Sequence, residues 1–488
     1  MSNGTASLSK RQPFRRTKIV ATLGPASDKA EMIRTLIACG VNVMRVNFSH
    51  GECAANCALI KRVRDISREM NTPVAVLQDL CGPKMRVRAM RGGEVPLAEG
   101  ARIVVTSDDA EGTPERISST YASLAADVAK GDRVLLDDGK MELRVESTQG
   151  WDVTCTVTRG GGLKSNKGMN LPGVRLSTPS VTDKDMSDLR AGVDAGVDYV
   201  GLSFVRDPDD VLRVKQLLQK AGKDVRVIAK IEKPEAVACI DEIIEAADGI
   251  MVARGDLGVE LPVEQLPPLQ KRIIRRCNHL DRPVIVATQM LESMMTNLQP
   301  NRAEVSDIAN AILDGTDAVM LSGETAAGRY PAEAVQMMHK IALQTEEFLL
   351  INLDSVPKPE SVPNRILDTI GRAAFRMIED LDLRLLITSS CTGETALFLS
   401  KSRTRAMVLG ATNTEAAWRR TSLYWGVVPA LCVREAGISK EEFLAVASRE
   451  AVRLGLAGPG EHAVVVTSTP ICTPGAVTNA IEVTKIAG

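Results

Sequence analysis

After a polar arm at residues 1–16, short apolar runs rich in β-branched residues alternate with longer stretches of helical periodicity. Eight runs follow this pattern: IVATLG from Ile19, VNVMRVNFS from Val41, VAVLQDL from Val74, DYVGLSF from Asp198, RVIAKIE from Arg226, GIMVARGDL from Gly249, PVIVATQ from Pro283 and DAVMLSGE from Asp317. Such runs, with helical stretches between them, are typical of parallel β/α units. Eight units over about 250 residues, once one insertion is set aside, predict an α/β fold of the (β/α)8 TIM-barrel type.

The insertion follows the third run and has a different pattern. The stretch RVLLDDGKMELRVES alternates apolar and polar residues around an Asp-Gly turn, which is typical of a β-hairpin. We therefore expect an all-β module at 84–171, inserted into a barrel formed by 17–83 and 172–350. Because the module leaves from the barrel rim where active sites gather, a lid is favoured over a passive decoration.

A third region follows the proline-containing stretch SVPKPESVPN. It begins with an amphipathic pattern, ILDTIGRAAFRMIEDL, and continues with the strand-like runs RLLITSS, RAMVLGA, VVPALCV and HAVVVTS. Helical patterns separate most of these runs, which predicts a C-terminal α/β domain at 358–488. No internal repeat is longer than the β/α unit itself.

Composition agrees with a multidomain globular protein. At about 150 residues per domain, 488 residues correspond to about three domains. Sixty basic and 61 acidic residues leave a net charge of -1, which argues against a nucleic-acid or acidic-membrane partner. No run of 18 apolar residues predicts a membrane span. The ten cysteines include no CxxC pair and no leader pattern is visible, so we expect no zinc site and a cytoplasmic location.

Polar residues end each of the predicted strands from the second onward. They are Arg45, Asn47 and Ser49 on the second strand, Asp79 on the third, Ser203 on the fourth, Lys230 and Glu232 on the fifth, Asp256 on the sixth, Thr288 on the seventh, and Ser322 and Glu324 on the eighth. In a barrel these ends lie at one rim, so the pattern predicts one shared site.

Two carboxylates in this set point to a metal. Lys230 and Glu232 are two positions apart and share one face of an extended strand, while Asp256 is expected in a glycine-rich turn. Oxygen donors with few histidines nearby favour Mg2+ or Mn2+. The alternatives are a salt bridge inside the barrel and an ordinary turn residue. Arg45 suits a phosphate or carboxylate, and Thr288 could equally fill the barrel.

Two further stretches are rich in backbone donors. GGGLKSNKG, at 160–168, could bind phosphate but does not match the P-loop pattern, and a flexible hairpin loop is the alternative. ITSSCTGETA, at 387–396, leads from a strand into a helix through Ser, Thr and Gly, which is a possible anion site.

Nine segments together resemble the pyruvate kinase family. They are KIVATLGPAS, RVNFSHG, GPKMRVR, NKGMNLPG, KIEKPEAV, MVARGDLGVE, ATQMLESM, NRAEVSDIANA and LSGETAAGRYP. The resemblance extends from about Arg16 to Gly488. It implies transfer of the phosphoryl group of phosphoenolpyruvate to ADP, giving pyruvate and ATP, with Mg2+ in a homotetramer.

The resemblance also implies residue roles. Glu232 and Asp256 would hold the metal, Lys230 would stabilise the phosphoryl group and Arg45 would bind its phosphate. Amides at Gly255 and Asp256, with Thr288, would bind the substrate carboxylate, and Thr288, Ser322 and Glu324 would order a proton-carrying water near the enolate. The implied nucleotide contacts are Pro25, Asn47, His50, Arg86 and Lys167.

The potassium site of the family is altered in this chain. Asn47, Ser49 and Asp79 are present, but Leu80 stands where the family has Thr, and Lys84 in GPK stands where it has Glu. This resembles the K+-independent branch, in which the ammonium group of Lys84 would replace the ion. The alternative is a solvated lysine at the lid hinge.

A regulatory site is implied in the C-terminal domain, at Thr388, Ser389, Ser390, Thr392, Gly393 and Thr395. Relatives that bind fructose bisphosphate here often have a basic residue in the loop. This chain has Glu394, which favours a monophosphorylated sugar or nucleotide. The alternative functions are a metal-dependent aldolase or lyase of the same barrel type and a catalytically silent sensor that binds a metabolite in the C-terminal domain.

Overall fold

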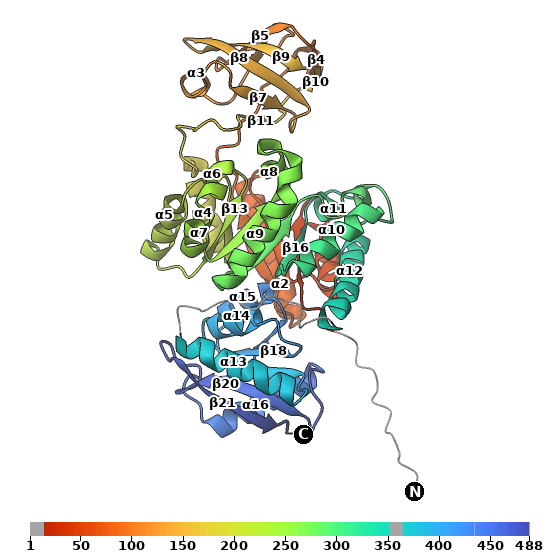
Figure 1. Cartoon of the computed structure of the whole chain (residues 1–488), viewed down its shortest axis with the longest axis vertical. Helices are drawn as coiled ribbons and strands as arrows, with labels where there is room; N and C mark the ends of the chain where they lie inside the picture. Colours follow the sequence, from red (N-terminus) through yellow and green to blue (C-terminus); the bar gives the residue numbers. More distant parts are fainter. Residues whose placement is uncertain (1–13, 352–364, 434, 488) are drawn as a thin grey trace.

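The computed structural model describes residues 14–351, 365–433 and 435–487, which form three bodies stacked along the long axis of the molecule (Figure 1). A β domain lies at one end, the barrel in the middle and an α/β domain at the other end. Most of the predicted arm, and the predicted linker at 355–364, lie outside the described residues. The domain limits given above remain our proposal.

Eight parallel strands close the central barrel, in the order β1-β16-β15-β14-β13-β12-β3-β2. They are β1 (Lys18–Leu23), β2 (Val43–Asn47), β3 (Ala75–Asp79), β12 (Tyr199–Leu202), β13 (Arg226–Ile231), β14 (Gly249–Ala253), β15 (Val284–Ala287) and β16 (Ala318–Leu321). Their residues are almost all buried, because side chains fill the barrel on one face and helices cover the other. The predicted TIM-barrel fold is confirmed.

Helices pack around this barrel, and apolar residues at helical spacing face the strands. They are α1 (Ala30–Ala38), α2 (Cys53–Glu69), α4 (Asp183–Ala195), α5 (Pro208–Lys220), α6 (Pro234–Ala238), α7 (Ile240–Ala246), α8 (Arg254–Glu260), α9 (Leu266–His279), α10 (Arg302–Leu313), α11 (Gly323–Ala326) and α12 (Pro331–Ile351). Capping boxes begin α4, at Thr182 and Asp185, and α10, at Asn301 and Glu304. None of the helices in the described ranges is both long and apolar enough to span a membrane.

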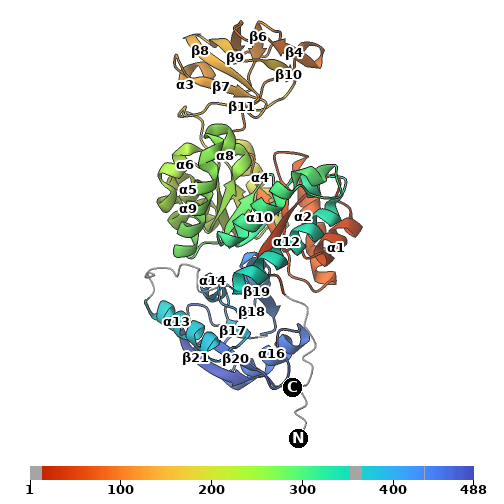
Figure 2. The ribbon, with the colours of Figure 1, turned by 45° about the vertical axis from the view of Figure 1, so that its right-hand side comes forward.

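The chain between β3 and α4 forms a separate β domain, which we call the lid (Figure 2). Its strands are β4 (Glu94–Leu97), β5 (Arg102–Thr106), β6 (Arg116–Ser118), β7 (Arg133–Leu136), β8 (Met141–Gln149), β9 (Asp152–Arg159), β10 (Gly161–Lys164) and β11 (Met169–Asn170). Six strands form one sheet, β11-β7-β8-β9-β5-β6, and β10 pairs with β4. The lid has its own apolar core, and the Asp-Gly turn predicted from the sequence joins β7 to β8.

The C-terminal domain is a five-stranded sheet in the order β19-β18-β17-β20-β21. The strands are β17 (Leu385–Ser389), β18 (Met407–Thr412), β19 (Val427–Leu431), β20 (His462–Ser468) and β21 (Thr478–Lys485), and the helices are α13 (Arg365–Asp380), α14 (Glu394–Lys401), α15 (Glu415–Arg420) and α16 (Lys440–Arg453). Four strands match the runs seen in the sequence. The antiparallel edge strand β21 was missed because polar residues interrupt its pattern.

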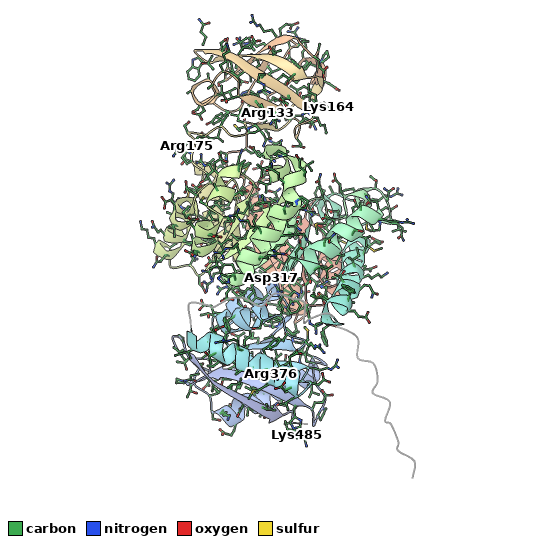
Figure 3. The ribbon with its side chains drawn as sticks, in the orientation of Figure 1. Arg133, Lys164, Arg175, Asp317, Arg376 and Lys485 are labelled. Carbon is green, nitrogen blue, oxygen red and sulfur yellow. The ribbon has the colours of Figure 1, made fainter. Side chains whose placement is uncertain are left out.

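Buried ion pairs join this domain to the amino end of the barrel. Asp317, which precedes β16, lies at the junction (Figure 3) and pairs with Lys401 at 2.6 Å and Arg403 at 3.0 Å. Asp198, which precedes β12, pairs with Arg419 at 3.0 Å. The C-terminal domain therefore contacts the end of the barrel opposite to the lid.

Candidate active site at the carboxyl end of the barrel

The polar residues at the strand ends gather at the rim that faces the lid. Register pairs Arg45 with Leu77 and Asn47 with Asp79 on neighbouring strands, and it places Gly201 beside Asp79. The closed barrel then brings β13 and β14 round the same rim. The strand ends are therefore assembled into one site, as a barrel requires.

Asp79 lies at the centre of a buried charge cluster. Arg45 donates to its Oδ2 through Nε at 2.6 Å and Nη2 at 2.5 Å, and Lys230 Nζ donates to its Oδ1 at 3.1 Å. Burial would raise the pKa of Asp79, but Arg45 and Lys230 together lower it. Asp79 therefore remains a carboxylate and orients two cations toward the rim.

Lys230 is held on three sides. Its ammonium group donates to Ser203 Oγ at 2.7 Å and pairs with Glu232 Oε1 at 2.9 Å, besides its bond to Asp79. Burial lowers the pKa of Lys230, but the charges of Asp79 and Glu232 raise it above the usual lysine value. The lysine is thus a permanent cation with a defined position.

Glu232 and Asp256 form an electrostatically strained pair of carboxylates. Glu232 is buried, and its Oε2 accepts a hydrogen bond from the Phe204 amide at 2.8 Å. Burial raises the pKa of Glu232; Lys230 opposes this rise and Asp256 adds to it. Asp256 is half-buried and lies in the first turn of the short helix α8, which begins at Arg254, so the expectation of a turn outside regular structure was wrong. Strand β14 ends at Ala253 and α8 begins at the next residue, Arg254, so no loop separates the strand from the helix.

These two carboxylates have the chemistry of a magnesium or manganese site. Both supply oxygen, the ligand atom that hard dications prefer, and the repulsion between them would be relieved by positive charge. Within the described ranges, no group of three or more His, Cys, Asp and Glu residues is placed to hold a metal ion. Water and substrate oxygens would have to complete the coordination, as is usual for Mg2+.

Thr288 and Gly255 contact each other across neighbouring strand ends. The Gly255 amide donates to Thr288 Oγ1 at 2.7 Å, and this hydroxyl donates to the Ala287 carbonyl at 2.6 Å. Thr288 has φ +71°, a left-handed conformation that is rare for a β-branched residue. Arg254, absent from the predicted set, supports this turn by donating to the Thr288 carbonyl at 2.7 Å. Local strain of this kind is found at functional sites.

Ser322 and Glu324 lie at the end of β16. Glu324 is buried, and its carboxylate accepts hydrogen bonds from the amides of Ser322 at 2.7 Å and Leu291 at 2.9 Å. It therefore ties β16 to the turn after β15. The Ser322 hydroxyl is buried and finds no hydrogen-bond partner among the described residues.

Of the expected nucleotide contacts, Arg86 and Lys167 lie on the lid. Arg86 Nη1 donates to the Asn166 carbonyl at 2.9 Å, and Lys167 pairs with Asp137 at 2.8 Å. His50 is exposed at the rim, and burial together with the charges of Arg86, Lys84 and Arg45 lowers its pKa. The positive charges of Lys84 and Arg86 are therefore close enough to His50 to disfavour its protonation.

Asn47 and Pro25, also expected at the nucleotide, lie at the end of β2 and after β1. Asn47 Oδ1 accepts a hydrogen bond from the Ser49 amide at 3.0 Å. Pro25 is exposed. Within the described ranges no hydrogen bond or ion pair joins these two residues to Lys167, so the predicted nucleotide contacts lie on separate parts of the rim and the lid.

Lys84 does not occupy the position expected of it. The side chain is exposed and, within the described part of the chain, forms no ion pair, whereas Asp79 is paired with Arg45 and Lys230. The predicted contact of Lys84 with Asp79 is therefore absent from this structure. The physical reason is that Arg45 and Lys230 already occupy both carboxylate oxygens of Asp79.

The expected effector residues surround the start of α14. Thr388 and Ser389 are buried, and their hydroxyls have no partner in the described ranges. Ser390 Oγ accepts from the Gly393 amide at 2.9 Å, and Thr395 Oγ1 lies 3.0 Å from Thr478 Oγ1. The Thr392 carbonyl accepts from Arg420 at 3.2 Å, which links this loop to the barrel junction.

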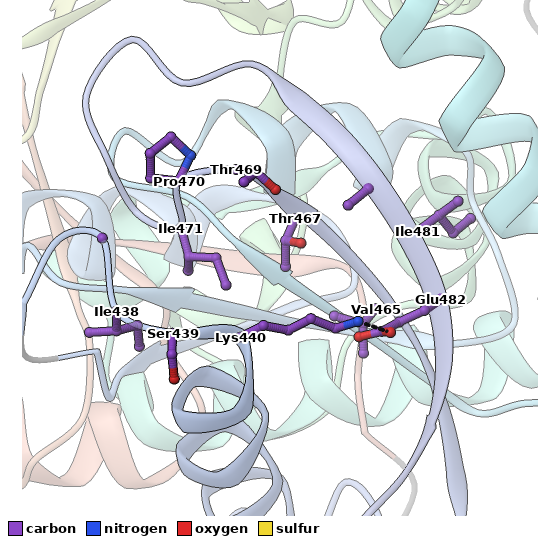
Figure 4. Close-up of a pocket in the computed structure, with 12 residues that line it drawn as sticks. Ile438, Ser439, Lys440, Val465, Thr467, Thr469, Pro470, Ile471, Ile481 and Glu482 are labelled. Atoms are coloured by element: carbon purple, nitrogen blue, oxygen red, sulfur yellow. Dashed lines mark ion pairs between the residues drawn. The ribbon is translucent and has the colours of Figure 1, made fainter.

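A cavity of about 340 Å³ lies in the same domain (Figure 4). It lies between the β19–α16 loop and strands β20 and β21, and Lys440 and Glu482 form an ion pair across it. Strand β21, one wall of the cavity, contacts the start of α14 through the hydroxyls of Thr478 and Thr395. The cavity was not predicted, because its walls come from segments without a shared motif.

Two family models match the chain: "Pyruvate kinase, barrel domain" over residues 14–335 and "Pyruvate kinase, alpha/beta domain" over residues 368–484. A pyruvate kinase of Geobacillus stearothermophilus is 44% identical over 474 residues, which cover 96% of this chain and 80% of the relative. One of Bacillus licheniformis is 42% identical over 455 residues, covering 93% and 77%. The crystal structure of a pyruvate kinase from Cryptosporidium parvum matches with a TM-score of 0.86 and 32% identity, covering 97% of this chain and 96% of that one.

Proposed function

The chain belongs to the pyruvate kinase family, and from that premise we propose how its residues transfer the phosphoryl group of phosphoenolpyruvate to ADP. It is a phosphotransferase, and the products of the reaction are pyruvate and ATP. The observation that carries the assignment of roles is the cluster of Arg45, Asp79, Lys230 and Glu232 beside Asp256 at one rim of the barrel.

Arg45 and Lys230 act on the phosphoryl group. Charge spreads over the phosphoryl oxygens during transfer, so fixed cations stabilise the transition state. The guanidinium of Arg45 is held by Asp79 and by Thr22 Oγ1, which accepts from Nη1 at 3.0 Å, and it binds the substrate phosphate. Lys230, a permanent cation, stabilises the group as it passes to ADP.

Glu232 and Asp256 hold Mg2+, or Mn2+ in its place. When bound, the dication supplies positive charge to the phosphate and carboxylate oxygens of the substrate. The raised pKa of Glu232, caused by burial and by Asp256, supports this assignment because a dication would restore the charged form. Glu232 is fixed by the Phe204 amide, so the site is partly formed beforehand.

The substrate carboxylate binds at the amides of Gly255 and Asp256, with Thr288. Because the Gly255 amide already bonds to the Thr288 hydroxyl, substrate would exchange that bond for one of its own. The enolate left after transfer must be protonated at carbon. Thr288 and the unpartnered hydroxyl of Ser322 would order the water that carries this proton, and Glu324 fixes the Ser322 backbone.

ADP binds between the rim and the lid. Pro25, Asn47 and His50 contribute from the barrel, and Arg86 and Lys167 from the lid. Lys167 is paired with Asp137 in this structure, so its contact with a phosphate requires exchange of that partner. Closure of the lid would exclude water from the transfer step.

A coupled assay tests the function. Pyruvate should form from phosphoenolpyruvate only when ADP and Mg2+ are both present. A metal-dependent aldolase or lyase would cleave or form a carbon bond without nucleotide, and a silent sensor would form no product. Failure of the unmodified enzyme to make pyruvate under these conditions would refute the assignment.

We propose that the enzyme does not require K+. Leu80 is buried at 1% exposure where the family has Thr, so the ion site lacks an oxygen ligand. The charge of Lys84, which lowers the pKa of His50 at the same rim, takes the place of the ion without pairing directly with Asp79. Turnover in tetramethylammonium buffer should be the same with and without KCl at matched ionic strength. Lys84→Glu, with Leu80→Thr beside it, should create a K+ requirement. Strong K+ activation of the unmodified enzyme would overturn the proposal.

We propose that a monophosphorylated sugar or nucleotide regulates the enzyme at the loop of residues 388–395. The loop contacts Arg420 at the barrel junction, and Thr395 contacts Thr478 of β21, a strand that lines the cavity, which supports a coupled role. Titration with ribose 5-phosphate, glucose 6-phosphate and AMP should identify an activator. Thr392→Asp, at an exposed loop position, should abolish that activation, while basal turnover stays the same.

We further propose a homotetramer and a cytoplasmic location, as expected of an enzyme of glycolysis in this family. Light scattering of the full chain would measure the mass in solution. A monomeric mass at micromolar concentration would refute the tetramer.

A further inference from the structure

Glu260 joins three parts of the molecule at the barrel rim. It is the last residue of α8, its side chain is buried, and its Oε1 accepts hydrogen bonds from Lys233 Nζ at 2.5 Å and Asn170 Nδ2 at 3.2 Å. Lys233 follows β13, α8 follows β14, and Asn170 belongs to β11 of the lid. One carboxylate oxygen thus connects two barrel loops and the lid.

Lys233 connects Glu260 to the metal-site residue Glu232, its neighbour in the chain. Its ammonium group also lies 5.9 Å from the centre of the Phe204 ring, and the Phe204 amide donates to Glu232 Oε2. Phe204 has φ +54°, so tertiary contacts, and not the conformational preference of phenylalanine, determine its backbone conformation. Lys233 and Phe204 therefore both contribute to holding Glu232 in place.

Helix α8 connects Glu260 to the other metal-site residue, Asp256. They are four positions apart, about one turn of the helix. A helix of seven residues is not stable by itself, so contacts at its ends decide where it lies. Arg254 pairs with Asp307 at 2.6 Å at the start, and Glu260 pairs with Lys233 at the end. The Glu260 pair therefore helps to place Asp256.

The lid rests on the same end of α8. Asn170 pairs in register with Leu135 of β7, and a Cβ added at Gly139, in the next turn, would lie 3.7 Å from Val259 Cγ1. Among the described residues, the hydrogen bond from Asn170 to Glu260 is the single one between the lid and α8. The second carboxylate oxygen of Glu260 is buried without a partner in the described ranges.

We propose that Glu260 is a positioning residue that couples the seating of the lid to the placement of Glu232 and Asp256. This inference rests on the proposed function, in which those two residues hold the metal. A buried ion pair is costly unless further hydrogen bonds support it, and Asn170 supplies the additional donor only while the lid is seated. Lid movement therefore loosens the pair, and with it both carboxylates.

Metal affinity, measured by calorimetric titration of Mn2+ into the full chain without substrate, tests the coupling. Asn170→Ala removes only the bond from the lid. We expect its Mn2+ affinity to fall about 10-fold, its KM for ADP to rise, its kcat to change less and its melting temperature to stay the same. Glu264→Gln, at an exposed position four residues after Glu260, is the matched control for the Glu260→Gln variant below and should not alter any of these values.

Glu260→Gln should weaken Mn2+ binding further, but it leaves Lys233 buried without a charge partner and can prevent folding. The double variant Glu260→Met with Lys233→Met removes both charges, keeps the site filled and should also bind Mn2+ about 10-fold more weakly while folded. Unchanged Mn2+ affinity in Asn170→Ala or in the folded double variant would overturn the proposal. Absence of pyruvate formation by the unmodified enzyme would instead refute the proposed function.

Discussion

At its amino end the barrel buries Asp317 between Lys401 and Arg403, whereas at its carboxyl end it buries Asp79 between Arg45 and Lys230. The two clusters have similar composition and burial. Around Asp317 the remaining contacts are structural: its Oδ2 also accepts from the Val284 amide at 2.8 Å. The cluster joins two domains, and both of its cations pair with the same carboxylate.

Around Asp79 the arrangement is open to a ligand. Glu232 has a raised pKa because burial and Asp256 both disfavour its charge, and within the described part of the chain Asp256 forms no ion pair or side-chain hydrogen bond. Thr288 holds a strained turn beside them. A buried charge cluster alone therefore does not mark an active site; unbalanced charge and strain next to such a cluster do.

Among tests of this comparison, Lys230→Met at the carboxyl end of the barrel should have the largest effect on activity. Loss of the cation that faces the phosphoryl group should lower kcat by about 1,000-fold, while Arg45 still pairs with Asp79 and preserves the fold. The coupled assay measures the loss of kcat. Calorimetric binding of phosphoenolpyruvate and the far-ultraviolet circular dichroism spectrum are the controls for substrate binding and folding. A variant that retains near-normal turnover would contradict the role of Lys230, and one that unfolds would make the residue structural.

Asp317→Asn tests the opposite end. Lys401 and Arg403 would remain buried without their counter-charge, so the free energy of unfolding should fall by about 3–5 kcal/mol, with kcat of the folded enzyme nearly unchanged. Urea unfolding measures the loss. Asp65→Asn is the control, because Asp65 is 69% exposed in its pair with Arg68 and should contribute less than about 1 kcal/mol. Equal losses of unfolding free energy in Asp317→Asn and Asp65→Asn would contradict the structural role of the Asp317 cluster.

Lys18→Met gives the smallest effect, seen in the pH dependence of stability. Lys18 donates to the Val427 carbonyl at 2.6 Å at the same junction, and burial, with the charge of Arg15, lowers its pKa from 10.5 to about 7. The unfolded chain holds this proton more tightly, so Lys18 makes stability rise with pH between about 7 and 10.5, by at most about 1.4 kcal/mol per pH unit. The variant should show a flatter melting-temperature profile from pH 7 to 9. If the slope of melting temperature against pH were the same in Lys18→Met as in the unmodified protein, the lowered pKa of Lys18 would be refuted.

Much of the architecture could be read from local pattern. The eight apolar runs predicted the barrel, and the change to period-two alternation predicted the β insertion. The polar residues at the strand ends predicted a common site because parallel strands in a barrel all end at one rim. The candidate residues Arg45, Asp79, Lys230 and Glu232 were found in this way, and the structure brings them into contact.

Tertiary structure decided which of these charges pair, at which residue the helix after β14 begins, and which side chains connect the lid to the barrel. Asp79 pairs with Arg45 and Lys230 instead of Lys84, Asp256 lies in the first turn of a helix, and Glu260 contacts Lys233 and Asn170. The physical reason is that local spacing determines which face a side chain takes, whereas its partner depends on the order in which distant strands close the barrel. That order is a property of the packed chain and is not encoded in any short segment of it.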